Sequence, residues 1–265
     1  QYQASTSYNL ATKGKVELAG GELTDPESPG TKVTWSNINM GFDVNKDLAG
    51  KYDMTLNEVS ATVLPEVMEE QDGEDMPKSI TMKMKDMKVE GSYNPTKWAY
   101  IYTGKGSYST ESFEMTSTDY AGKTTSLIEK GLKATSDISL DGDFMSAKSE
   151  NTVDSIAIDG KDFGKLTYNV ELNHIEANAA NALIEAFFTV FKSVSDDENA
   201  NQEMVSEILS SWAENHGLAI FNNQPQIKLN PVSISDDQGK VSLDLNVALA
   251  KDPKFDLMKG SLYKQ

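Results

Sequence analysis

The sequence predicts a mainly β (α+β) fold, in which serial hairpins form a long, curved antiparallel sheet with an inserted amphipathic helical hairpin. Three observations favour this fold class. Apolar and polar residues alternate along much of the chain, Gly, Asp and Asn recur in the turns, and residues 176–216 change to helical spacing. We expect all 265 residues to form one β-rich domain with a sizeable core.

The predicted strands follow a period of two, which places apolar side chains on one face and polar side chains on the other. The clearest runs cover residues 80–85, 166–172 and 241–249. Such alternation is typical of antiparallel sheets with one covered face. Gly-Lys introduces three strands after acidic or Asn-rich turns, a chemistry that suits hairpins. These strands begin at Gly50, Gly164 and Gly239.

Two segments are predicted to be helices. Glu176 to about Val194 carries apolar residues at steps of three and four, and Asn201 to His216 forms a second stripe, with Gly217 placed to cap its end. We expect this helical hairpin to lie on the apolar face of the sheet. If it covers only part of that face, the rest is available to a ligand or a partner chain. Sealing of the core is the alternative role for the candidate residues, which are Leu183, Phe187, Phe191, Ile208 and Trp212.

The charge of the chain is strongly negative. Asp and Glu number 41 against 24 basic residues, all of them lysine, and the net charge is -17 at pH 7. Nucleic acids and anionic membrane surfaces attract clustered positive charge, so we expect neither as a direct partner. The acidic stretch from Glu66 to Pro77 is predicted to be a loop.

Residues suited to catalysis, metal binding or cofactor binding are scarce. The chain has no cysteine and two histidines, His174 and His216, which we interpret as structural or surface residues. The run DVNKD at residues 43–47 resembles the start of an EF-hand loop, but Leu48 replaces the required glycine and Met54 the bidentate glutamate. We therefore predict a hairpin turn there, with no catalytic residues, no cofactor and no metal in the chain.

An aromatic cluster leaves a carbohydrate-binding or glycan-active protein open as an alternative. The cluster partly alternates along predicted strands, and it consists of Trp98, Tyr100, Tyr102, Tyr108 and Phe113. Such rings can line a carbohydrate platform, and the many carboxylates can supply pairs for glycoside hydrolysis. A cross-strand packing ladder explains the same spacing without any ligand.

The last third of the chain resembles a known family. The stretch FGKLTYNVELNHIEANAANAL, residues 163–183, runs from a strand directly into a helix, and QIKLNPVSI and GKVSLDLNV follow the second helix. This order is similar to the YdgA-like family of bacterial envelope proteins, a domain-of-unknown-function group. The resemblance implies a periplasmic location in a Gram-negative bacterium, with an inner-membrane anchor that would precede Gln1. It implies no catalytic motif.

The leading hypothesis is a non-enzymatic bacterial envelope protein that binds an apolar ligand or an envelope protein on a partly covered face of the sheet. The period-two strands, the amphipathic helices and the family resemblance motivate it. A secreted adhesive or structural module that pairs through an exposed strand edge is a further alternative. A homodimer is compatible with either hypothesis.

Overall fold

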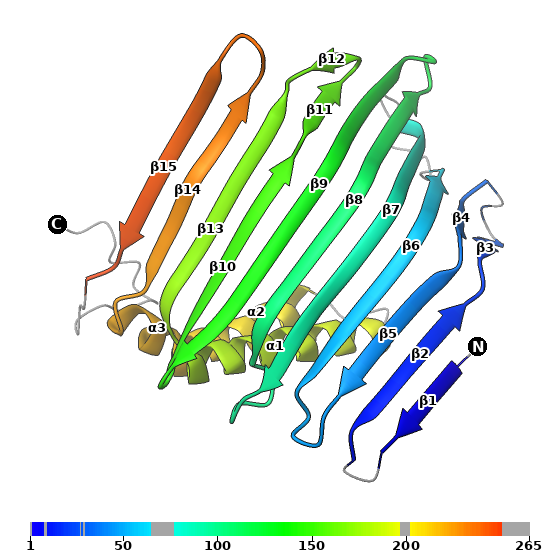
Figure 1. Cartoon of the computed structure of the whole chain (residues 1–265). Helices are drawn as coiled ribbons and strands as arrows, with labels where there is room; N and C mark the ends of the chain where they lie inside the picture. The colour runs from blue at the N-terminus through cyan, green and yellow to red at the C-terminus, as the bar shows by residue number, and fades with distance from the viewer. Residues whose placement is uncertain are drawn as a thin grey trace.

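The computed structural model describes residues 2–7, 10–26, 28, 30–64, 77–196 and 202–250, with only the backbone at 193–196, 202 and 203. The predicted acidic loop lies outside these residues except for Pro77. The described strands form one 15-stranded antiparallel sheet, so the predicted fold class is confirmed (Figure 1).

Eleven strands follow one another across the sheet, mostly in chain order. They are β1 (Tyr2–Thr6), β2 (Thr12–Leu18), β5 (Ile38–Val44), β6 (Gly50–Val63), β7 (Pro77–Pro95), β8 (Tyr102–Asp119), β9 (Thr124–Asp141), β10 (Phe144–Val153), β13 (Lys165–Glu176), β14 (Gln226–Ser235) and β15 (Lys240–Ala248). Four short strands lie off this path, namely β3 (Gly21–Thr24), β4 (Lys32–Trp35), β11 (Ser155–Ile158) and β12 (Lys161–Asp162).

The turn between β5 and β6 shows how local sequence joins the strands. The Asn45 side-chain oxygen accepts hydrogen bonds from the backbone N–H groups of Asp47 and Ala49. Leu48 takes the left-handed conformation with φ 63°. This Asn-centred turn closes a hairpin, as predicted for the run that resembles an EF-hand loop.

The helical hairpin is present and consists of α1 (Ala177–Asp196) and α2 (Gln202–Trp212). The Glu176 carboxylate accepts a hydrogen bond from the Ala179 N–H and so caps the first turn of α1. The prediction that Gly217 ends the second helix is wrong. Gly217 is buried in a right-handed helical conformation, and the chain continues through a π-helical turn, residues 213–217, into α3 (Leu218–Asn222).

The helices lie on one face of the sheet, across one end of its strands (Figure 1). Their contact with the sheet is a small cluster of buried residues, Ile101, Ala177 and Ala180, with Trp98 and Ile184 packed against it. Few other apolar side chains are buried, and none of the larger ones is fully enclosed. Most of the sheet therefore has no second layer over it.

Candidate functional site: the open apolar face

The register of the sheet divides its side chains between an apolar face and a polar face. Residues directly opposite one another on antiparallel strands point to the same side, so the pairing can be followed from edge to edge. One complete row on the apolar face consists of Tyr2, Val16, Met40, Met54, Val89, Tyr108, Ala134, Asn151, Tyr168, Val232 and Leu243. Asn151 is the single amide in a row that otherwise consists of apolar residues and tyrosines.

The neighbouring row of the apolar face contains small residues in the middle of the sheet. Tyr52 lies opposite Gly91, and the row continues through Gly106, Ser136 and Ser149. A Cβ atom added at Gly91 would lie 2.6 Å from the Tyr52 hydroxyl, so the tyrosine ring lies directly over this glycine. The two glycines let the ring rest against the backbone of the sheet.

Aromatic side chains continue from this row toward the helices. Tyr93 has its ring centroid 6.5 Å from that of Tyr52 and makes an edge contact with Tyr102 at 5.9 Å. Nearby, Tyr100 stacks on Phe188 of α1 at 5.6 Å. The backbone N–H of Tyr100 donates to the Asn181 side chain of the same helix. One aromatic group thus lies along the open part of the apolar face, and a separate aromatic pair joins Tyr100 to the helix that covers its end.

An irregular point in β7 keeps apolar residues on the same face along the strand. Val89 lies opposite Tyr108, and Met84 lies five residues before Val89 in the same strand. In a regular strand, two residues an odd number of positions apart point to opposite faces. Between Met84 and Val89, Asp86 has φ 50°. The Tyr108 hydroxyl donates to the Met84 sulfur at 3.3 Å, so both side chains lie on the apolar face.

One charged residue lies on this face. Met84 is opposite Phe113, which in turn is opposite Glu129. The pairing of the eleven described strands on the main path shows which side chains share the apolar face. Among them, apart from residues at strand ends, Glu129 is the one charged side chain on this face. Burial raises the pKa of Tyr108, and the negative charge of Glu129 raises it further. The face is thus apolar over a large area, and Glu129 is its acidic side chain.

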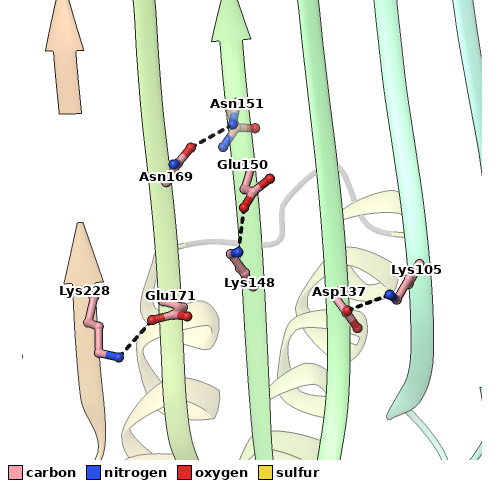
Figure 2. A network of polar contacts seen from close by, with 8 residues as sticks. All are labelled: Lys105, Asp137, Lys148, Glu150, Asn151, Asn169, Glu171 and Lys228. Carbon is pink, nitrogen blue, oxygen red and sulfur yellow. Dashed lines mark hydrogen bonds and ion pairs between the residues drawn. The ribbon is translucent and has the colours of Figure 1, made fainter. Parts of the chain in front are cut away.

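The opposite face carries ordered pairs of charges (Figure 2). Across five neighbouring strands, side chains of alternating sign lie opposite one another in the order Lys105, Asp137, Lys148, Glu171 and Lys228. The Lys228 ammonium is 3.0 Å from the Glu171 carboxylate, and its hydrogen bond is the main cause that lowers the pKa of Glu171. These charges satisfy one another, which makes this face a solvated surface.

The five residues predicted to form an apolar ligand or partner face fall into two groups. Ile208 and Trp212 line a groove of about 450 Å³ between α1 and α2, and the Trp212 indole N–H donates to the Ala179 carbonyl. Phe187 and Phe191 are exposed on α1, by 55% and 73%. Leu183 is half-buried in the same helix. Ile208 and Trp212 thus share the groove, and the other three residues, all in α1, are not part of its lining.

A partly covered apolar face was expected from the sequence, but the strand residues that form it were not among the candidates. Its members come from strands up to about 240 residues apart, for example Tyr2 and Leu243 in one row. The available signal was the alternation within each strand. That signal shows which residues of one strand share a face, but it cannot show which residues of other strands lie beside them.

The two histidines and the acidic residues were the sequence candidates for chemistry. Among the residues that the structure describes, no group of three or more His, Asp or Glu side chains could hold a metal ion. His174 stacks on Phe144, and its Nδ1 lies 2.5 Å from the Asn223 carbonyl oxygen. His216 lines the groove between α1 and α2. The described helices include none with the length and apolar character that a membrane crossing requires.

The aromatic residues proposed as a carbohydrate platform are divided among different surroundings. Trp98 packs on the buried cluster beneath α1, and Tyr100 stacks on Phe188 of that helix. Tyr102 contacts Tyr93, whereas Tyr108 contacts Met84. These four rings therefore have separate packing partners.

Comparison with known proteins identifies the family. Residues 1–262 match the model of a bacterial protein family of unknown function, DUF945. The chain belongs to this family. The YdgA-like resemblance is confirmed, and the match extends over almost the whole chain rather than the last third alone.

Two relatives from Haemophilus influenzae strain Rd are both described as uncharacterized proteins. One is 27% identical over 256 residues, which are 96% of this chain and 62% of that protein. The other is 59% identical over 61 residues, which are 23% of this chain and 39% of that protein. The chain thus spans less than two thirds of the length of either relative. No solved structure matches it.

Proposed function

We propose that this DUF945 protein is a non-enzymatic binding protein of the bacterial envelope that takes up an elongated apolar ligand, such as the hydrocarbon part of an uncharged amphiphile. The observation that carries the proposal is the apolar face of an eleven-strand path, which the described helices cover at one end alone. Exposed apolar area of this extent in a soluble protein usually marks a binding surface.

The scarcity of polar groups on this face favours hydrocarbon over a protein partner. Protein interfaces usually contain about one hydrogen bond per 100–200 Å². The apolar face offers few donors or acceptors, because its rows consist mainly of aliphatic, aromatic and glycine residues. A hydrocarbon chain needs no hydrogen bonds and gains free energy from every apolar contact that leaves water.

The charge distribution favours an uncharged ligand over an anionic one. Glu129 is the charged residue of the face, and the chain as a whole carries a net charge of -17. An anionic head group near this face would meet a repulsive field. We therefore expect neutral amphiphiles to bind more tightly than fatty acids with the same chain.

Neighbouring residues on opposite faces give a direct test. Ser136 and Thr135 are adjacent in β9, and both are exposed, but Ser136 belongs to the apolar face and Thr135 to the polar face. Binding of the neutral dye Nile red, followed by its displacement with monoolein, measures ligand affinity. We expect Ser136→Asp to weaken dye binding about tenfold, because ligand contact would desolvate the added carboxylate.

Thr135→Asp is the matched control and should leave the dye affinity unchanged. Equal effects of the two substitutions, or no saturable dye binding to the parent protein, would refute the proposed site. Circular dichroism of both variants checks that the sheet is intact. Native mass spectrometry of the purified protein adds an independent measurement, since a ligand retained from the cell would appear as an added mass.

The envelope location is part of the same proposal and is supported by the resemblance to YdgA-like proteins. Fractionation of the source bacterium, with the protein detected by antibody, tests it. Recovery in the cytoplasmic fraction alone would contradict the location but would leave the dye-binding test valid.

A further inference from the structure

The strand β15 forms one edge of the described sheet. It lies at the end of the strand path, and no described strand pairs with its second side. All nine of its residues are exposed. A strand edge of this kind presents unpaired N–H and C=O groups, which are a template for another strand.

Two common devices that protect an edge from pairing, a proline and a bulge in the edge strand, are not found within β15. It contains no proline, and the extra residue in its pairing with β14 lies in β14, between Leu229 and Val232. Its valine and leucine side chains all lie on the apolar face. Val241 and Leu243, which are exposed by 73% and 58%, lie toward the end of the strand away from the helices. A second strand added here would extend both the hydrogen-bond ladder and the apolar face.

The charges of β15 are complementary to those of a second copy in one register. Lys240 and Asp244 are its two charged residues, and both lie on the polar face. When two identical strands pair antiparallel about Ser242, each Lys240 lies opposite the Asp244 of the other copy. Pairing centred on Asp244 would instead put two carboxylates opposite each other, which is unfavourable.

We propose that two copies of this chain associate through antiparallel pairing of β15 with β15, in the register that places Ser242 opposite Ser242. The two-fold axis is perpendicular to the sheet, as an isologous contact between identical strands requires. The apolar faces of the two copies then lie on the same side. Val241 of each copy lies opposite Leu243 of the other, and one continuous sheet follows, with eleven path strands from each copy.

Single cysteines test the register without interference, because the chain contains none of its own. Opposed residues of antiparallel strands have Cα atoms about 4.5–5.5 Å apart, which suits a disulfide. We expect Ser242→Cys to form a covalent dimer on mild oxidation. Asn246→Cys is the matched control on the same strand and face. In the proposed register it lies opposite Gln238 and should stay monomeric on a non-reducing gel.

Charge reversal tests the same register in solution. Lys240→Asp alone and Asp244→Lys alone each replace two attractive pairs with two repulsive ones, so we expect about tenfold weaker dimerisation by sedimentation equilibrium. The double variant, Lys240→Asp with Asp244→Lys, restores both pairs and should recover the affinity. Measurement at about 0.15 M salt screens the repulsion between the two acidic copies beyond about 8 Å.

Three results would overturn the proposal: a parent protein that stays monomeric at high concentration, equal cross-linking of the two cysteine variants, or a double charge reversal that fails to recover the affinity. Dye binding on the apolar face does not depend on β15 pairing. Loss of dimerisation with retained dye binding would therefore reject this inference alone.

Discussion

The two ends of the apolar face show how the same side-chain pattern serves different purposes. At the end covered by α1, Ile101 is exposed by 2% and Ala177 is completely buried. Toward the other end and the edges, apolar residues such as Leu18 in β2 remain half exposed. Both regions belong to one sheet with the same alternation. Apolar alternation thus shows that one face of the sheet can be buried. Whether that face is buried depends on which other segments pack against it.

The open region is held together within the sheet rather than by a second layer. Strands β7, β8 and β9 have 18 or 19 residues each and pair over most of their length. Cross-strand contacts such as that of Tyr52 over Gly91 add lateral packing. The covered end contributes the enclosed packing that usually dominates stability, so substitutions in the two regions should have unequal effects.

The largest expected effect is at the covered end. Ile101→Ala removes a side chain from the buried cluster beneath α1 and should lower the free energy of unfolding by about 2–5 kcal/mol. Leu18→Ala, on the open apolar face, should cost about 0.5 kcal/mol or less. Urea unfolding followed by circular dichroism measures both. Similar losses for the two variants would show that the open region is covered in solution.

A smaller effect is expected where the open region packs laterally. Gly91→Ala introduces a Cβ atom 2.6 Å from the Tyr52 hydroxyl and 2.9 Å from the Lys105 carbonyl, so it should cost about 1–2 kcal/mol. In a Tyr52→Ala background the same change should cost less, because the ring is gone. A double-mutant cycle by urea unfolding measures the coupling. A cost that is independent of Tyr52 would show that the ring does not lie over Gly91.

The smallest effect is expected on the polar face, where the pairs are solvated. Lys228→Met should raise the pKa of Glu171 toward its ordinary value of 4.5, since the hydrogen bond from Lys228 lowers it. Carboxyl NMR titration measures this change, and Lys165→Met is the control because it leaves the Glu171 contact intact. An unchanged pKa in Lys228→Met would mean that the Lys228 contact does not form in solution.

The sign of the accompanying pH dependence follows from the lowered pKa. The stabilisation by ionised Glu171 is present above the unfolded pKa of about 4.5 and is lost as the pH falls through the lower folded-state pKa. Because both side chains are about one third exposed, water screens the pair and its contribution is about 1 kcal/mol or less. Lys228→Met should remove this part of the acid dependence.

Much of the fold could be predicted from the sequence, while most of the candidate site could not. The turn at Asn45 and the two amphipathic helices depend on interactions within a few residues, so local patterns were sufficient. Gly217 failed as a helix end because buried packing kept it in a right-handed helical conformation. Glu129 could not be assigned to the apolar face from alternation alone, since Gly131, with φ 64°, interrupts the alternation between Ala134 and Glu129 within β9.

The sequence by itself determined that this chain forms amphipathic strands, hairpin turns, two helices and an acidic solvated surface. These properties follow from the period of the side chains and from turn chemistry, which act over short distances. The tertiary structure alone decided the register that aligns Tyr2 with Leu243 across the sheet, the placement of α1 over one end, and the exposure of Phe187 and Phe191. Register and coverage depend on contacts between distant segments, and a local pattern carries no information about which segments meet.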